Sequence, residues 1–138
     1  YYYLLIFKCL FEYVSKQARI ILDGKEVANQ HFYTINIGLC KYSGGGMQFV
    51  PHAEIDDGVF AVTYIDSIPK LKVIFSTHYL YGGKIAKFKH AKLFKAKHIK
   101  VEAVDDAPTL LELDGEFVGE TPVAFEILPK ALKVIVGK

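Results

Sequence analysis

Residues 91–128 read AKLFKAKHIKVEAVDDAPTLLELDGEFVGETPVAFEIL, and this stretch decides the predicted fold. It contains short segments rich in β-branched and aromatic residues, which are typical of strands: 91–96, 98–103, 109–113, 116–118 and 123–128, with a further one at 132–136. Asp114-Gly115 can supply the positive φ angles of a tight hairpin turn, and Pro122 and Pro129 interrupt the strands. So many short strands predict a mainly β fold, an antiparallel β-sandwich.

The residues before this stretch predict a second hairpin and two helices. Asp23-Gly24 separates strand-like residues 19–22 from Val27, and further strands are predicted at 32–37 and 59–65. Apolar residues at helical spacing predict an N-terminal helix over 2–17. A second, inserted helix is predicted from Ser67-Ile-Pro69 to Gly82-Gly83. Its predicted inner face consists of Leu71, Ile74, Phe75, His78 and Tyr79.

Length and composition indicate one globular domain over 1–138. The chain has 138 residues, of which 51% are apolar and 23% charged, and this balance excludes intrinsic disorder. The net charge of +2 does not imply a polyanion partner, and no RNP-type motif indicates nucleic-acid binding. Cys9 and Cys40 lack CxxC spacing and are interpreted as reduced core thiols of a cytoplasmic protein.

The start of the chain is apolar but short. Residues 1–7 are all aromatic or aliphatic, yet Lys8 follows, so the run is shorter than a membrane span requires. The first residue is Tyr1 rather than methionine. We therefore expect the chain to begin inside a longer protein.

Three short motifs have both a structural and a chemical interpretation. Gly44-Gly45-Gly46 is either a plain loop or a backbone cradle for an anion such as phosphate. Asp56-Asp57-Gly58 is either a solvated turn or a source of oxygen ligands for a hard cation. In Leu113-Asp-Gly-Glu116, the glutamate is either an exposed strand residue or a base positioned by the turn. The five histidines form no HxH or HExxH pattern, so a zinc site is not expected.

Charge is distributed unevenly over the second half of the chain. Residues 101–129 hold eight acids and no lysine or arginine, whereas residues 84–100 hold seven lysines and no acid. This basic run is either an ordinary solvated strand face or a surface that faces an anionic membrane. Its members are Lys84, Lys87, Lys89, Lys92, Lys95, Lys97 and Lys100.

The order of the motifs resembles a known family. The glycine triplet with Met47, Pro51-x-Ala53, Asp56-Asp-Gly58, Leu113-Asp-Gly-Glu116 and the ending Phe125-Glu-Ile-Leu-Pro129 follow one another in the chain. This set resembles the C-terminal lobe of the diacylglycerol kinase-like lipid kinases, the soluble bacterial enzymes related to sphingosine and ceramide kinases. The resemblance implies a β-sandwich lobe of a two-lobed kinase whose N-terminal lobe, absent from this chain, binds the nucleotide.

The resemblance also implies roles for individual residues. Glu116 would be the catalytic base, and Gly44, Gly45 and Gly46 would form a substrate or phosphate loop. Mg²⁺ would be held by the side chain of Asp57 and by the backbone carbonyls of Glu54 and Val59, with ATP as co-substrate. Two positions depart from the family: Leu39 stands where an asparagine is frequent, and the Gly-Gly-Asp-Gly nucleotide motif is absent from these 138 residues.

The function expected on this basis is transfer of the γ-phosphate of ATP to a hydroxyl of a lipid such as diacylglycerol. The chain alone would be inactive, because it lacks the nucleotide motif. The alternatives are a non-catalytic module that binds lipid or membrane, and a relative of the NAD kinases. We expect a cytoplasmic protein that associates transiently with a membrane surface. The aromatic start would also favour a homodimer.

Overall fold

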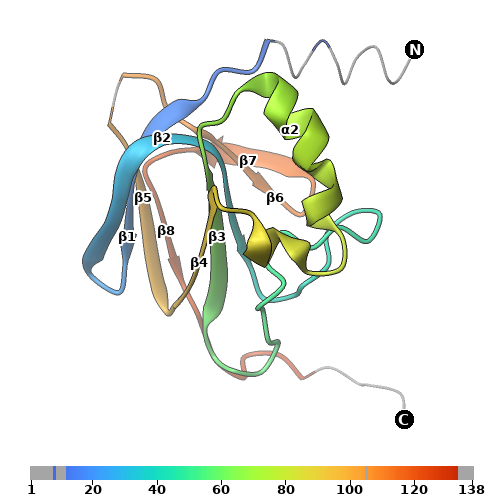
Figure 1. Cartoon of the computed structure of the whole chain (residues 1–138). Helices are drawn as coiled ribbons and strands as arrows, with labels where there is room; N and C mark the ends of the chain where they lie inside the picture. The colour runs from blue at the N-terminus through green and yellow to red at the C-terminus, as the bar shows by residue number, and fades with distance from the viewer. Residues whose placement is uncertain (1–7, 9–11, 105, 134–138) are drawn as a thin grey trace.

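The fold is mainly antiparallel β, as the sequence predicts. The structure is a computed structural model that describes residues 8, 12–104 and 106–133 (Figure 1). From Lys16 onward, one α-helix and two 3₁₀ turns interrupt the described strands. In chain order the elements are β1 (Lys16–Leu22), β2 (Lys25–Gly38), β3 (Phe60–Asp66), α2 (Lys70–Ser76), η1 (Thr77–Leu80), η2 (Lys84–Lys87), β4 (Ala91–Ala96), β5 (His98–Ala103), β6 (Leu110–Leu113), β7 (Glu116–Glu120) and β8 (Val123–Glu126).

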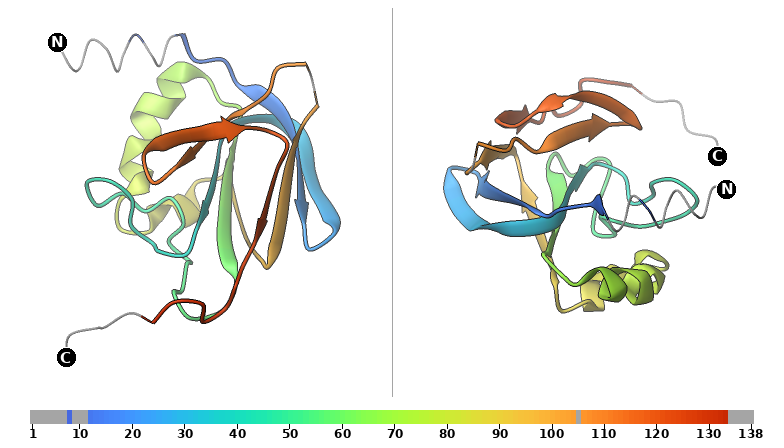
Figure 2. Two further views of the ribbon diagram at one scale, coloured as in Figure 1. Left: turned by 180° about the vertical axis from the view of Figure 1, so that it is seen from behind. Right: turned by 90° about the horizontal axis from the view of Figure 1, so that it is seen from above.

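Two sheets make up the sandwich-like domain. Six strands form the larger sheet in the order β4-β3-β2-β1-β5-β8, with every neighbouring pair antiparallel. The β6–β7 hairpin forms the smaller sheet. Viewed from above, this hairpin lies over one face of the larger sheet, while α2 and the 3₁₀ turns lie on the other side (Figure 2).

The first hairpin confirms the prediction made from Asp23-Gly24. Both residues have positive φ, 48° and 81°, and Leu22 pairs with Lys25 across the turn. The return strand β2 runs unbroken to Gly38, so it includes the predicted strand 32–37. The predicted strands at 91–96 and 98–103 coincide with β4 and β5.

Alternating side chains of the central strands build the main core. Ala18, Ile20 and Leu22 of β1 are buried in turn, and Ile20 packs with Val62 of β3 and Ile99 of β5. A second cluster on the α2 side contains Ile65, Ile85, Phe88 and Ala91. Burying both faces of the sheet in this way requires covering elements on each side.

The prediction that the inserted helix buries an inner face is wrong. The α-helix ends at Ser76, and it has no buried residue: Leu71 is 63% exposed and Phe75 76%. His78 is also exposed, and only Tyr79 of the predicted face packs against the second cluster together with Leu80 of the same 3₁₀ turn. Ile85 and Phe88, which follow the glycine pair, fill the space over the sheet instead.

The predictions for the first helix and for Cys40 are corrected, and those for the last strand and for Cys9 fall mostly outside the described residues. Residues 13–15 are irregular and Lys16 begins β1, so the first helix does not extend to residue 17. Most of the predicted strand 132–136 lies outside the described residues. Cys40 is a free thiol but exposed, not part of the core, and Cys9 lies outside the described residues.

Among the described residues, no helix has the length and apolarity to span a membrane.

Candidate functional site

The β6–β7 hairpin presents Glu116 at the first position of β7. Asp114 and Gly115 form the turn with positive φ of 51° and 90°, and Leu113 pairs with Glu116 directly beyond it. The carboxylate is exposed, and no described side chain bonds to it. A tight turn therefore holds an accessible acceptor at a defined place, which is the arrangement that a general base requires.

Exposed apolar side chains lie along the same hairpin: Leu113 pairs with Glu116, and Leu110 pairs with Glu120 at the other end. Leu110, Leu113, Phe117 and Val118 are all more than half exposed. Such a concentration of exposed apolar groups is typical of a surface that contacts a ligand or another part of the protein. The hairpin thus combines exposed acids (Glu112, Asp114, Glu116 and Glu120) with apolar surface on which an acyl chain could lie, and it is the motif order that singles out Glu116 among them.

The glycine triplet forms a turn that closes on itself. Gly44, Gly45 and Gly46 have φ of 28°, 58° and 82°, and the Ser43 N–H donates to the Met47 carbonyl at 2.9 Å. The segment between β2 and β3 that contains this turn, drawn in teal, lies on the same side of the molecule as the turn of the β6–β7 hairpin (Figures 1 and 2). Binding of an anion by the triplet stays a prediction.

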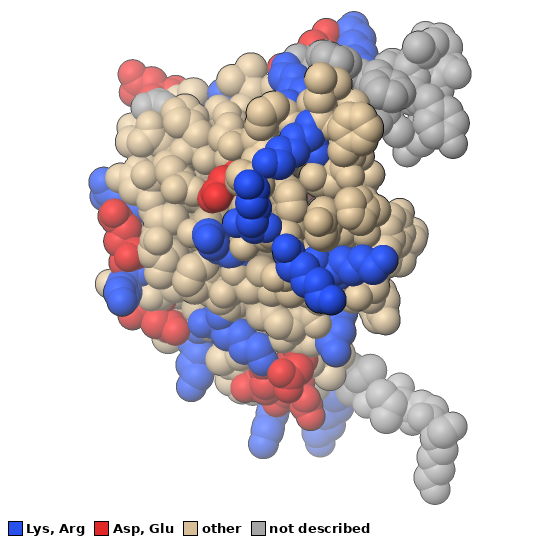
Figure 3. Space-filling model, viewed as in Figure 1, with Lys and Arg blue, Asp and Glu red and all other residues tan. Residues whose placement is uncertain are grey.

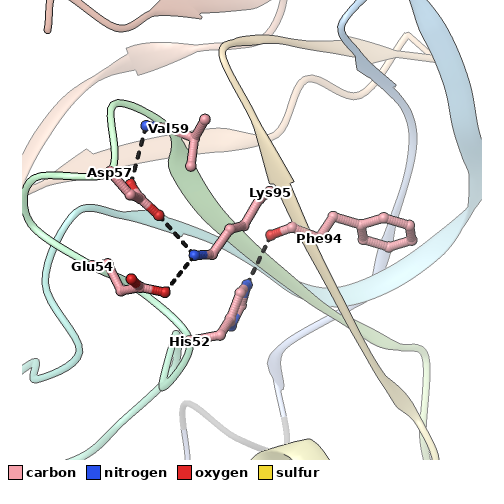
Figure 4. A network of polar contacts seen from close by, with 6 residues as sticks. All are labelled: His52, Glu54, Asp57, Val59, Phe94 and Lys95. Carbon is pink, nitrogen blue, oxygen red and sulfur yellow. Dashed lines mark hydrogen bonds and ion pairs between the residues drawn. The ribbon is translucent and has the colours of Figure 1, made fainter.

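The predicted metal ligands lie in a loop that contacts β4 (Figure 4). The Lys95 ammonium donates to Asp57 Oδ2 and to Glu54 Oε1, at 2.7 Å each. The backbone N–H of Val59 donates to Asp57 Oδ1 at 3.1 Å. The hydrogen bond from Lys95 holds the pKa of the Asp57 carboxyl below its ordinary value, and the bonds to Asp57 and Glu54 raise the pKa of Lys95.

This arrangement does not fit Mg²⁺ as the side chains lie. Both oxygens of Asp57 already accept hydrogen bonds, one of them from a cation, and Glu54 contributes its side chain to the same cation. The described residues contain no group of three or more His, Cys, Asp or Glu side chains that could hold a metal ion, but the predicted site uses a single carboxylate with two backbone carbonyls. Mg²⁺ at this loop stays a prediction that would require Lys95 to move away.

His52 was not predicted to have a role, yet it contacts the same strand. Its Nε2 lies 2.8 Å from the carbonyl oxygen of Phe94, while its Nδ1 is buried without a hydrogen-bonding partner. The tautomer that donates from Nε2 therefore fits best. No local sequence pattern could reveal this contact, because the two residues are 42 positions apart.

The seven lysines of the basic run do not share one surface. Lys95 faces the acidic loop, and Lys100 pairs with Glu102 at 2.7 Å. Near α2 a lysine contacts a histidine rather than an acid: the Lys72 ammonium lies 2.6 Å from His90 Nε2. Burial and then the charges of Lys72, Lys89 and Lys92 lower the pKa of His90. Figure 3 shows basic side chains extending over the face that carries α2.

Comparison with known proteins identifies the family. The sequence model of the YegS C-terminal NAD kinase beta sandwich-like domain matches residues 1–136. The chain belongs to this family. The resemblance to diacylglycerol kinase-like lipid kinases, inferred from the motif order, is thereby confirmed.

Relatives of this YegS C-terminal domain bear kinase names. The chain is 25% identical to a diacylglycerol kinase of Mycobacterium tuberculosis (strain ATCC 25618 / H37Rv), over 85% of the chain and 37% of that protein. It is 26% identical to a diacylglycerol kinase of Staphylococcus carnosus (strain TM300), over 99% of the chain and 44% of that protein. The chain therefore spans less than half the length of these relatives.

A solved structure supports the fold of the YegS C-terminal domain. A crystal structure of a diacylglycerol kinase from Bacillus anthracis str. Sterne superposes with a TM-score of 0.70 at 22% identity. The match covers 93% of this chain and 42% of that one. The mainly antiparallel, sandwich-like architecture is thus shared with that kinase.

Proposed function

We propose that this chain is the lipid-handling lobe of an ATP-dependent lipid kinase that phosphorylates a hydroxyl of a lipid such as diacylglycerol. The observation that carries the proposal is the β6–β7 hairpin of a YegS C-terminal domain, on which an exposed carboxylate stands among exposed apolar side chains. A lipid alcohol needs both: an acceptor for its proton and apolar surface for its chains.

Glu116 is the proposed base. It accepts the proton of the lipid hydroxyl as the hydroxyl oxygen attacks the γ-phosphorus of ATP. The bond between that phosphorus and the β–γ bridging oxygen breaks, and ADP leaves. Phosphoryl transfer of this kind depends mainly on positioning and charge neutralisation, and Mg²⁺ bound with ATP would supply the charge neutralisation. ATP and its Mg²⁺ would be bound mainly by a nucleotide lobe outside these 138 residues.

A membrane is the proposed partner on the α2 face. Leu71 and Phe75 are exposed one turn apart on α2, and Lys72, Lys89 and Lys92 lie within electrostatic range of His90. Apolar groups flanked by lysines suit a transient contact with anionic lipid at the cytoplasmic surface of a membrane. This placement assigns only part of the basic run to the membrane.

The test is phosphate transfer from labelled ATP to a panel of lipid alcohols, with NAD as a further acceptor. It uses the complete gene product that contains this chain. Glu116→Gln should lower turnover by about 10²–10⁴-fold. Glu112→Gln, on the exposed face of the same hairpin, is the matched control and should keep wild-type turnover. Near-normal turnover of Glu116→Gln would remove Glu116 from the mechanism.

The exposed apolar residues of α2 favour a second candidate, a non-catalytic membrane-binding module. It predicts salt-sensitive binding to anionic vesicles without transfer to any lipid, and no effect of Glu116→Gln. Transfer to NAD alone would instead place the protein with the NAD kinases, whose sandwich the family description names.

A further inference from the structure

We propose that the Lys95 ammonium is a built-in cation that holds the loop before β3 in place of a divalent metal ion. The proposal rests on the position of the Lys95 nitrogen, which bridges two carboxylates. It lies 2.7 Å from Asp57 Oδ2 and 2.7 Å from Glu54 Oε1 (Figure 4). The inference concerns the loop and does not depend on the proposed kinase activity.

The geometry around Asp57 leaves little room for a second cation. Its side chain is only 19% exposed, and its two oxygens accept from the Val59 N–H and from Lys95. A divalent ion that used these oxygens would lie within a few ångströms of the ammonium, and like charges at that separation repel. A metal ion at the predicted site and Lys95 therefore compete for the Asp57 carboxylate, while Lys95 also occupies the Glu54 side chain.

The bridge fixes the loop to a defined strand. Lys95 pairs with Ala61 in the β3–β4 ladder, so its backbone is part of the sheet. The loop residues Glu54 and Asp57 directly precede β3, and the His52 ring contacts the carbonyl of the neighbouring residue Phe94. Two successive residues of β4 thus anchor the chain where it enters β3, and this anchoring needs no metal.

The Glu54 side chain is 61% exposed and that of Lys95 38%, so each of the two contacts taken alone is a surface ion pair. Such pairs contribute little when both groups are solvated and free to move. Here one ammonium serves two acids that lie three positions apart, so removing it leaves two adjacent carboxylates without their common partner. The altered loop then resembles an acidic cation site, which gives the proposal a measurable consequence.

The experiment measures binding of Ca²⁺ and Mg²⁺ by calorimetry and thermal melting with and without EDTA, in the absence of nucleotide. The complete gene product is compared with its Lys95→Met and Lys92→Met variants. Lys92 is on the same strand, and no described carboxylate pairs with it. EDTA should move the wild-type melting temperature by less than about 1 °C. Lys95→Met should bind Ca²⁺ at least about tenfold more tightly than wild type, whereas Lys92→Met should not.

Further variants assign the binding to this loop and protect against a folding failure. Adding Asp57→Asn to Lys95→Met should abolish the gain in Ca²⁺ affinity. If Lys95→Met does not fold, Lys95→Gln keeps hydrogen-bond donors but removes the charge, and the same gain is expected. Wild-type protein that binds Mg²⁺ through Asp57 and melts earlier in EDTA would overturn the proposal. So would unchanged metal affinity after removal of the Lys95 charge. Neither readout involves phosphate transfer, so failure here is distinguishable from failure of the kinase proposal.

Discussion

Replacing Asp23 tests how the first hairpin is joined to the rest of the sheet. Asp23 Oδ1 accepts the backbone N–H groups of His98 at 2.9 Å and Lys97 at 3.0 Å, and the Asp23 N–H donates to the His98 carbonyl. The turn between β1 and β2 is thus bonded to the turn between β4 and β5, about 75 residues away. Asp23→Ala removes both side-chain bonds and leaves two N–H groups that water must satisfy.

The expected loss of unfolding free energy depends on how exposed the Asp23 side chain is. The Asp23 side chain is 52% exposed, so water replaces part of what is lost, and we expect about 1–2 kcal/mol in total. For a domain of this size that lowers the melting temperature by about 3–8 °C. Asp23→Asn keeps an acceptor and tolerates positive φ, so it should lose less than half as much. Thermal melting followed by circular dichroism measures all three proteins.

The pH dependence gives an independent check. The hydrogen bond from the His98 N–H, aided by that of Lys97, holds the pKa of the Asp23 carboxyl below its ordinary 3.8. The stabilisation is therefore present above that value and is lost as the pH falls through the folded-state pKa. The difference between wild type and Asp23→Ala should shrink in that acid range. An Ala variant that melts within about 1 °C of wild type at neutral pH would refute the reasoning.

Two other predictions concern the main core and the contact between Lys72 and His90. Ile20 is fully buried in the main core, so Ile20→Ala should lower the free energy of unfolding by about 3–4 kcal/mol and Ile20→Val by about 1 kcal/mol in denaturant titrations. Equal losses would show that the site collapses around the smaller side chain. Burial, followed by the charge of Lys72, lowers the pKa of His90 from 6.5, so protonation of His90 destabilises the folded protein as the pH falls below 6.5. Lys72→Met should raise the midpoint of the His90 titration by NMR, and an unchanged midpoint would contradict this interpretation.

Local patterns predicted the hairpins because their cause is local. Asp23-Gly24 and Asp114-Gly115 both adopt positive φ, and such turns depend on two residues that the sequence displays side by side. Strand alternation likewise located β4 and β5. These features need no knowledge of the rest of the chain.

Side-chain burial and ion pairing could not be read in the same way. Helical spacing marked Leu71 and Phe75 as buried, yet Ile85 and Phe88, later in the chain, occupy the sheet face that the helix was expected to cover. The partner of Asp57 is Lys95, 38 positions away, and the run in which Lys95 stands indicates only a solvated strand face or a membrane-facing surface. Only the sheet register brings these groups together.

The order of the larger sheet also bears on how this domain behaves at high concentration. Strands β4 and β8 are its two edges, and an unpaired edge is a template on which another chain can add a strand. β4 carries Lys92 and Lys95 on alternate faces, whereas β8 has four residues and follows Pro122. Charge at one edge and short length at the other both oppose edge-to-edge aggregation.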